Sequence, residues 1–269
     1  MEIEQPVISF CTTCSNRVNQ LKLVFEENIA KIAAHSRVEW ILVNFNSKDD
    51  LDNFIFSKIE KLPRSFIYIR ELSGRPWHLS VAKNVAHRLA HGTILMNLDC
   101  DNRILDAIAT IRRYFSQGCK CLHNSSGVFS DGTAGRIAIN SELFFMLGGY
   151  DEALYPMGYQ DRDLIERASA AEIPIVRKAC PPHAAIKNSK KESVCYCRYG
   201  QMTWEDYNSS NRMISFRNIA AGRLVANCSG GWGTAHVEEY YGGNTIDRDK
   251  LFSNITVLPP IISSEFPRS

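Results

Sequence analysis

An apolar segment ends abruptly in two aspartates in the stretch Ile94-Leu95-Met96-Asn97-Leu98-Asp99-Cys100-Asp101-Asn102. The apolar residues are typical of a buried strand. The carboxylates that follow are hard oxygen ligands, of the kind that Mg²⁺ and Mn²⁺ prefer. The same Asp-x-Asp spacing also occurs at residues 50–52, 161–163 and 247–249, so the spacing alone indicates only a charged surface. Whether Asp99 and Asp101 form a ligand site therefore depends on the strands, helices and loops predicted around residues 94–102.

Strand-like and helix-like segments alternate through the first half of the chain. Strands are predicted at residues 6–10, 39–43, 66–69 and 94–98. Helices are predicted at residues 18–32, 51–59, 78–90 and 104–115, where apolar side chains recur at helical spacing. This alternation predicts an α/β fold with parallel βαβ units in a doubly wound sheet. Ligands of such sheets bind beyond the carboxyl ends of the strands, so we expect the polar loops after the first, second and fourth strands to meet.

The second half of the chain is less regular. Strands are predicted at residues 136–139 and 173–176, and helices at 141–147, from Gln160 onward, and at 202–224. No internal repeat or low-complexity tract interrupts the chain. We predict a single domain over residues 1–257, followed by an extended tail at residues 258–269, which is rich in proline and serine.

Composition limits the possible classes of function. The chain has 269 residues, of which 45% are hydrophobic and 22% charged, and its formal net charge is +2. This balance does not favour a nucleic-acid partner. No segment is apolar for long enough to cross a bilayer, and the acidic Glu2 and Glu4 argue against a secretory signal. We therefore expect a cytoplasmic protein whose nine cysteines are mostly reduced thiols rather than a zinc site.

Four blocks in order resemble the family 2 glycosyltransferases, which have the GT-A fold. The blocks are residues 8–17, residues 39–49, Leu79-Ser80-Val81-Ala82-Lys83-Asn84 leading to residues 97–102, and Gly148-Gly149-Tyr150-Asp151-Glu152 followed by residues 158–164. Together they span about residues 6 to 190, and the ordered set is far more specific than any single block. The resemblance implies a GT-A-like domain with a nucleotide-binding half at about 1–103 and an acceptor-binding half at about 104–257.

The resemblance also implies an activity. It is the metal-dependent transfer of a sugar, with inversion, from a nucleotide-diphosphate sugar, with a UDP-sugar favoured. The acceptor is a saccharide or another hydroxyl-bearing molecule of a bacterial-type glycan or a glycosylated natural product. The cofactor is Mn²⁺ or Mg²⁺. Neither nucleic acid nor a transmembrane segment is expected, and peripheral membrane contact is left open.

Carboxylates and one histidine are the candidates for chemistry. Asp99 and Asp101 are expected to bind the metal, because the departing diphosphate develops charge that a cation neutralises. His183 is the candidate third ligand, with His236 as the lesser choice. Asp161 is the candidate general base, since an inverting transfer needs a carboxylate to take the acceptor proton. The neighbouring Asp163 is expected to cap a helix or pair with an arginine.

Polar residues of the matching blocks are the candidate contacts of the donor. They are Thr12, Thr13, Asn16, Arg17, Asn44, Ser47, Lys83, Asn84 and Asp99. Three positions depart from the family pattern: Asn44 stands where an aspartate is usual, Asn46 where glycine is common, and Gln160 where glutamate is frequent. Asn44 still offers hydrogen bonds but no charge, which weakens the expectation of uridine. The candidate parts of an acceptor floor are Tyr155, Met157 and Tyr159, with Trp204 and Trp232 as further candidates.

Other classes of function remain open on sequence. One is a non-catalytic nucleotide-sugar-binding or accessory subunit, against which the retained Asp161 argues. Another is a sugar nucleotidyltransferase, which is expected to have a glycine-rich phosphate loop after the first strand. The loop here, Cys11-Thr12-Thr13-Cys14-Ser15, contains no glycine. The sequence does not determine the donor sugar, the acceptor or the oligomeric state.

Overall fold

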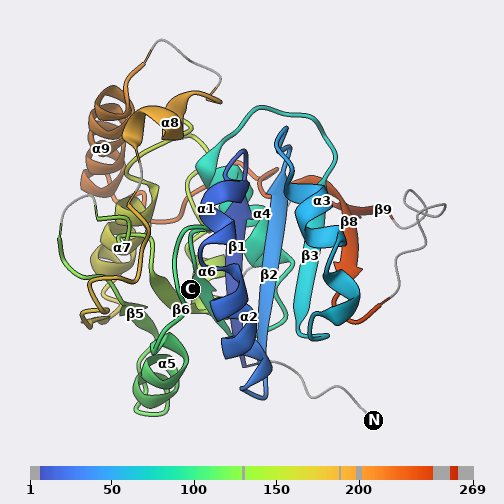
Figure 1. Cartoon of the computed structure of the whole chain (residues 1–269). Coiled ribbons are helices and arrows are strands. Elements are labelled where there is room, and N and C mark those ends of the chain that lie inside the picture. Colours follow the sequence, from blue (N-terminus) through green and yellow to red (C-terminus); the bar gives the residue numbers. More distant parts are fainter. Residues whose placement is uncertain (1–6, 129–130, 188, 198–201, 245–254, 260–269) are drawn as a thin grey trace.

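The fold is built on one mixed sheet with helices on both faces (Figure 1). The computed structural model describes residues 7–128, 131–187, 189–197, 202–244 and 255–259. Within these residues the sheet has nine strands in the order β7-β5-β6-β4-β1-β2-β3-β8-β9. All nine cysteines lie in the described residues and are free thiols, as the sequence predicts.

Four parallel strands form the centre of the sheet. They are β1 (Ile8–Cys14), β2 (Val38–Phe45), β3 (Phe66–Glu71) and β4 (Ile94–Asn97). Strand β1 pairs in parallel with both β2 and β4, and β2 pairs in parallel with β3. Nearly every residue of these strands is buried, which is the pattern of a sheet covered on both faces. The predicted parallel α/β core is confirmed.

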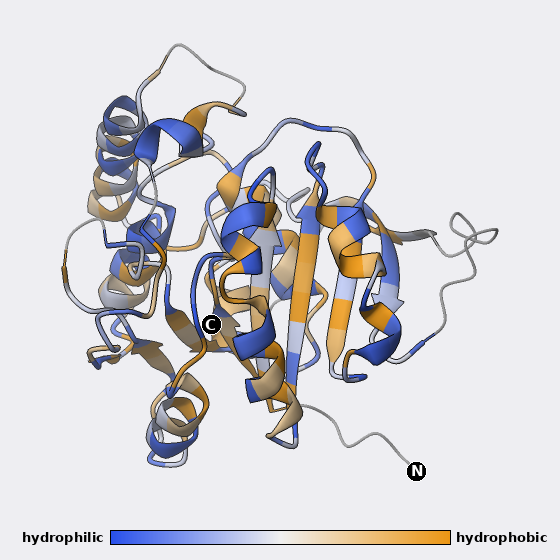
Figure 2. Cartoon of the chain, viewed as in Figure 1, coloured by the Kyte–Doolittle hydropathy of each residue, from blue (hydrophilic) through white to orange (hydrophobic). Residues whose placement is uncertain are grey.

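The helices divide between the two faces of the sheet. Helices α1 (Val18–Lys22), α2 (Phe25–Ala33), α3 (Leu51–Phe56) and α5 (Ala107–Phe115) contribute to one hydrophobic cluster. Helices α4 (Leu79–Arg88), α6 (Ser141–Met146) and α7 (Gln160–Ala170) contribute to the other. Figure 2 shows apolar residues concentrated in the strands and polar residues on the outward surfaces of the helices. The result is the three-layer arrangement of a doubly wound fold.

The flanks of the sheet are mostly antiparallel. They comprise β5 (Cys121–His123), β6 (Ile137–Asn140), β7 (Ile175–Arg177), β8 (Ala235–Tyr241) and β9 (Ile255–Leu258). Strand β6 is antiparallel to β4 and to β5, and β8 is antiparallel to β3 and to β9. The remaining helices are α8 (Lys190–Val194), α9 (Trp204–Ala220) and a 3₁₀ turn, η1 (Ile59–Lys61).

Several flank elements differ from the sequence prediction. Strands β5, β8 and β9 and helix α8 were not predicted, because they are short or rich in charged residues. The predicted helix at 18–32 is two helices, broken between Lys22 and Phe25. Leu258, predicted to open the tail, ends strand β9 and pairs with Ala235. Residues 260–269 of the predicted tail lie outside the described residues.

The strand order creates a crevice beside β1. Strand β1 lies between β2 and β4. The connections from β1 to β2 and from β2 to β3 cover one face, whereas α4 precedes β4 on the other face. The point where the winding reverses is where open α/β sheets bind ligands. The loops after β1 and β4, including Asp99 and Asp101, therefore meet at this crevice.

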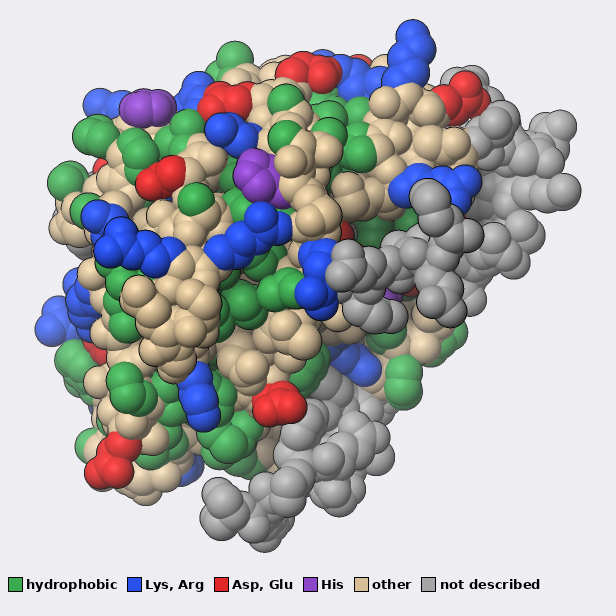
Figure 3. Space-filling model, turned by 90° about the horizontal axis from the view of Figure 1, so that it is seen from below, with side chains coloured by type: hydrophobic (Ala, Val, Ile, Leu, Met, Phe, Trp, Pro, Cys, Tyr) green, Lys and Arg blue, Asp and Glu red, His purple; other side chains and the backbone are tan. Residues whose placement is uncertain are grey.

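Two surface properties bear on partners. No helix in the described part of the chain is both long enough and apolar enough to span a bilayer. Figure 3 views the molecule from below Figure 1, where basic side chains lie in small groups among neutral ones, with acidic residues between them. This mixture is typical of an ordinary solvated surface.

Candidate active site

A cavity of about 950 Å³ opens at the crevice beside β1. Its inner side, which we call the strand-end wall, consists of Thr13, Arg17, Lys83, Asp99 and Asp101. Its other side, which we call the outer wall, carries Arg162, Glu166, Arg177, Lys178, Lys190, Glu192 and Arg212. Asp161 and Gly135 lie between the two walls and also line the cavity. The cavity therefore joins the two halves of the sequence.

A buried lysine connects the two principal candidate carboxylates. The Nζ atom of Lys83 lies 2.6 Å from Asp161 Oδ1 and 3.3 Å from Asp99 Oδ1. Only 1% of the Lys83 side chain is exposed. Burial disfavours its charge, but the two carboxylates outweigh burial and raise the pKa of Lys83. This cation therefore fixes the separation of two carboxylates that are 62 positions apart in the chain.

Gly135 keeps the space between those carboxylates open. A Cβ atom at this position would lie 2.6 Å from Asp99 Oδ2 and 3.2 Å from Asp161 Oδ2. The Gly135 carbonyl accepts a 2.7 Å hydrogen bond from Asn97 Nδ2, and the same amide donates to Asp99 Oδ1 at 3.1 Å. The hydrogen bond from Asn97 thus orients the Asp99 carboxylate. Neither Gly135 nor Asn97 was a predicted site residue, although Asn97 is the polar exception within an otherwise apolar strand.

Asp161 occupies the first turn of α7, where the helix dipole favours a carboxylate. Tyr159, immediately before the helix, has the left-handed φ of 74°. Burial raises the pKa of Asp161, the Lys83 ammonium opposes this shift, and the Asp99 carboxylate adds to it. One cation faces two anions here, so Asp161 holds a proton more readily than a free aspartate. A carboxylate of raised pKa that faces a cavity suits proton transfer.

Asp101 lies deeper in the strand-end wall. Its Oδ1 accepts a 2.8 Å hydrogen bond from Asn102 Nδ2, and its Oδ2 lies 3.8 Å from a terminal nitrogen of Arg17. The Oδ1 of Asn102 is buried and has no hydrogen-bond partner among the described residues. Asp99 and Asp101 thus present oxygen ligands beside two cations, Arg17 and Lys83.

The predicted three-residue metal set is not assembled. The described residues contain no cluster of three His, Cys, Asp or Glu side chains that could hold a metal ion. His183 is exposed, and its carbonyl accepts from Arg103. His236 lies on β8, on the far side of β3 from the crevice. The two aspartates alone fit an ion that takes its other ligands from a phosphate group and water, which is the usual arrangement for Mg²⁺.

Four predicted donor contacts instead build the loops around the crevice. Thr12 Oγ1 donates to the Leu98 carbonyl and accepts from Trp40. Ser47 Oγ accepts from the backbone N–H of Asn16, and Asn44 Oδ1 accepts from that of Ser47. None of the four belongs to the cavity lining among the described residues. Their hydrogen bonds join the loop after β1 to the loop after β2.

Asn84 also differs from its predicted role. It is fully buried, and its Nδ2 donates to the Tyr150 carbonyl and to Glu152, while its Oδ1 accepts from Tyr150 N–H. Successive residues of a helix point in different directions, so Asn84 does not face the cavity that Lys83 lines. Of the predicted donor contacts, Thr13, Arg17, Lys83 and Asp99 line the cavity.

The outer wall contains groups that the sequence analysis did not identify. The terminal nitrogen of Arg177 lies 3.3 Å from His123 Nδ1, and His123 Nε2 lies 2.9 Å from the Ala134 carbonyl. Burial lowers the pKa of His123, and the charges of Arg177 and Arg162 lower it further. The imidazole is therefore neutral, with its proton on Nε2. Nothing in the spacing of residues 123, 162 and 177 indicates that they meet.

Aromatic and acidic neighbours of Asp161 have distinct roles. Tyr159 and Trp204 line the cavity as predicted, whereas Tyr155 does not. The Tyr159 hydroxyl donates to both oxygens of Glu166, at 2.9 and 3.0 Å. Asp163 is buried and pairs with Arg167 at 2.8 Å, which confirms the prediction that it pairs with an arginine.

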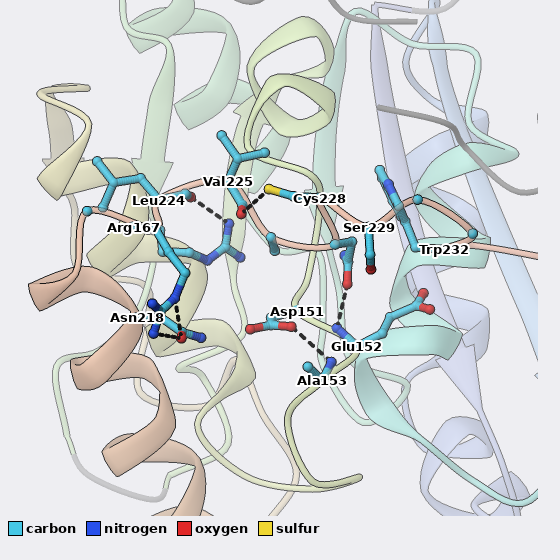
Figure 4. Close-up of a pocket in the computed structure, with 16 residues that line it drawn as sticks. Asp151, Glu152, Ala153, Arg167, Asn218, Leu224, Val225, Cys228, Ser229 and Trp232 are labelled. Atoms are coloured by element: carbon cyan, nitrogen blue, oxygen red, sulfur yellow. Dashed lines mark hydrogen bonds between the residues drawn. The ribbon is translucent and has the colours of Figure 1, made fainter. Parts of the chain in front are cut away.

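A second cavity, of about 680 Å³, lies between α7, the end of α9 and residues 222–232 (Figure 4). Its polar groups bond to its own walls: Asp151 accepts from Ala153 N–H, and Asn227 accepts from Glu152 N–H. Arg167 donates to the Leu147 and Gly149 carbonyls. Of the candidate acceptor aromatics, Trp232 lines this cavity, whereas the candidate carboxylates Asp99, Asp101 and Asp161 line the cavity beside β1.

No model of a known protein family and no curated protein matches the chain. Solved structures do. The chain is similar to the 1–349 segment of S. aureus TarS, with 13% identity, 80% of this chain and 72% of that chain covered, and a TM-score of 0.52. It is also similar to the mannosyltransferase PcManGT from Pyrobaculum calidifontis, with 14% identity, 82% and 72% covered, and a TM-score of 0.53. At such identities the likeness establishes the fold, which is the predicted GT-A fold.

Proposed function

We propose that the chain is an inverting glycosyltransferase of the family 2 type. It moves a sugar from a nucleotide-diphosphate sugar, with a UDP-sugar favoured, to an acceptor hydroxyl. The observation that carries this proposal is the bridge from Lys83 to Asp99 and Asp161 inside the 950 Å³ cavity. The bridge holds a strand-end carboxylate suited to the donor beside a helix carboxylate suited to the acceptor.

The structural neighbours support the same class of ligand. TarS was crystallised with UDP-GlcNAc, in a structure that covers 83% of this chain with a TM-score of 0.50. PcManGT was crystallised with GDP-Man and Mn²⁺. In this chain, Thr13 lies near the end of β1, Arg17 follows that strand, and Asp99 and Asp101 follow β4, at the crevice where doubly wound sheets bind nucleotides.

A divalent ion fits the strand-end wall if the donor shares it. Asp99 and Asp101 would hold Mn²⁺ or Mg²⁺, with diphosphate and water oxygens as the remaining ligands. When bound, the ion neutralises the charge of the leaving diphosphate. Arg17 and Lys83 add positive charge on the same wall, and both already face aspartates there.

The protein side chains divide the reaction between them. The acceptor oxygen attacks the anomeric carbon and forms the new glycosidic bond. The bond from that carbon to the diphosphate oxygen breaks, and the nucleoside diphosphate leaves with the electron pair. Asp161 takes the acceptor proton, while Lys83 keeps the Asp161 carboxylate oriented. Gly135 leaves room for the reacting atoms between Asp99 and Asp161.

Calorimetry with a panel of nucleoside diphosphates, with and without Mn²⁺, tests the proposal. We expect one nucleotide to bind in a metal-dependent manner, and Asp101→Ala to abolish that dependence. Asp50→Ala is the matched control, because Asp50 belongs to another Asp-x-Asp pair and is not among the residues that line the cavity. Binding that neither the metal nor Asp101→Ala affects would refute the metal assignment, and absence of any nucleotide binding would refute the proposed function.

A further inference from the structure

The charge of the outer wall differs from that of the rest of the molecule. Its cations are Arg162, Arg177, Lys178, Lys190 and Arg212, and its carboxylates are Glu166 and Glu192. The whole chain, by contrast, has a net charge of only +2. The wall thus has five cations against two carboxylates, and a concave surface with an excess of one charge concentrates ligands of the opposite sign.

Most of these cations have no ion-pair partner. Among the described residues, Lys190 pairs with Glu205, but Arg162, Arg177, Lys178 and Arg212 form no ion pair with a carboxylate. The two carboxylates of the wall, Glu166 and Glu192, offset only part of its positive charge, since the wall has five cations. Both oxygens of Glu166 accept from the Tyr159 hydroxyl, which holds this carboxylate beside Tyr159.

Two of the arginines, Arg162 and Arg177, line the same cavity as Asp161 and His123. Arg177 contacts the His123 ring at 3.3 Å, and both Arg177 and Arg162 act electrostatically on that ring, as does Asp161. His123 is neutral, so it orients Arg177 without adding a charge. Arg162 directly follows Asp161 at the start of α7. An anion bound by these two arginines would lie close to the carboxylate that takes the acceptor proton.

We propose that the acceptor is an acidic saccharide, and that Arg162 and Arg177 bind a carboxylate or phosphate close to the hydroxyl it offers. The guanidinium group presents paired N–H donors whose spacing matches the oxygens of these two groups. Lys178 and Arg212 extend the positive surface along the cavity, which suits a chain with further negative charges. This inference rests on the proposed glycosyltransferase function and names its acceptor class.

A saccharide array tests the inference directly. Each saccharide is immobilised in a neutral, a carboxylated and a phosphorylated form, and the protein is applied with saturating nucleoside diphosphate and Mn²⁺. We expect the charged forms to retain about tenfold more protein than their neutral counterparts, as is usual for a hydrogen-bonded charge pair. The form that retains more protein distinguishes a carboxylate from a phosphate.

Variants locate the effect on the outer wall. The double variant Arg162→Gln/Arg177→Gln is expected to lose the preference for charged forms, whereas Arg217→Gln, an exposed arginine of α9 that does not line the cavity, keeps it. Both arginines of the double variant are exposed, so the fold is not at risk.

Three outcomes would overturn the inference: equal retention of neutral and charged forms, retention of no charged form, or an unchanged preference in the double variant. Nucleotide affinity, measured in parallel, distinguishes a wrong acceptor class from a wrong proposed function. If the nucleotide binds and the acidic forms do not, the acceptor class is wrong and the proposed function stands. If no nucleotide binds, the proposed function itself fails.

Discussion

The two walls of the cavity differ in whether their charged side chains are paired and buried. On the strand-end wall, Lys83 and Arg17 each face aspartates, and Lys83 is almost completely buried. On the outer wall, Arg162 and Arg177 are exposed and form no ion pair with a described carboxylate. A wall of paired, buried charges is preorganised for one fixed reaction, whereas exposed and unpaired cations are available to a ligand. The comparison predicts large effects from the first wall and smaller ones from the second.

The largest effect is expected from Asp161→Asn, which removes the group that takes the acceptor proton. Turnover should fall about a thousandfold, the usual range for a general base, while nucleotide affinity stays unchanged. Because the pKa of Asp161 is raised, turnover by the wild type should decline on the acid side at a pH above the usual aspartate range. Product formation by mass spectrometry, followed across pH, measures both effects.

Asp163→Asn is the matched control for that experiment, on the same helix. It removes the partner of the buried Arg167, so it should lower the melting temperature without a comparable loss of turnover. Normal turnover by Asp161→Asn would show that the base lies elsewhere.

Lys83→Met should destabilise the fold by about 3 kcal/mol, since it leaves buried carboxylates without their cation. Lys190→Met on the outer wall removes a part-exposed ion pair with Glu205 and a contact of the ammonium with the Trp204 ring, and the loss should stay at about 1 kcal/mol or less. Urea unfolding of the two variants compares the walls directly. Equal losses of stability would contradict the difference between buried and exposed charge.

His87 contacts the backbone of Lys83, a residue of the strand-end wall. Below pH 7 it should account for a large part of the change in unfolding free energy with pH. Burial lowers its pKa to about 3, its Nδ1 lies 2.7 Å from the Lys83 carbonyl, and its ring stacks on Phe144. In the unfolded chain its pKa returns to about 6.5. Between these values the unfolded chain binds more protons than the folded chain, so stability is lost as pH falls.

The variant His87→Gln isolates this contribution. From pH 7 to pH 5 the wild type should lose about 2 kcal/mol more stability than the variant, as measured by urea unfolding at each pH. His183→Gln, at an exposed position, is the control and should follow the wild type. Parallel curves for the wild type and His87→Gln would mean that the imidazole is not held neutral in the folded protein.

Gly135→Ala is the smallest of these perturbations and acts where the walls meet. The added methyl group would press on Asp99 Oδ2 at 2.6 Å, and turnover should fall about tenfold as the carboxylates are displaced. Ala34→Ser, at an exposed position that is not among the residues lining the cavity, should leave turnover near the wild-type value. Full activity of Gly135→Ala would show that the gap between the carboxylates is not used.

The accuracy of the sequence predictions also differs between regions. The parallel core was predicted because its strands are continuous apolar runs and its helices have a clear periodicity. Strand β8 was missed because it contains Glu238 and Glu239, and only the tertiary contact of Glu238 with Arg70 makes burial of that carboxylate tolerable. The three residues of β5 carry too little pattern to be recognised.

The predicted site residues fall into two groups in the structure. Asp99, Asp101 and Lys83 line the cavity, whereas Asn84, Asn44 and other residues that the sequence analysis assigned to the donor are not among its described lining residues. Their side chains instead hold loops together. A polar residue in a loop motif has the same letter whether it contacts a ligand or a backbone N–H, so only the hydrogen bonds distinguish the two roles.

The sequence by itself determined the α/β core, the crevice beside the first and fourth strands, and the carboxylates at its mouth. These features depend on local patterns and on chain order, which the sequence contains. Only the tertiary structure decided that Lys83 bridges Asp99 to Asp161, that Gly135 leaves the space between them, and that Arg162, Arg177 and His123 line one cavity. These contacts join residues tens of positions apart, and long-range packing, which leaves no periodic trace in the sequence, brings them together.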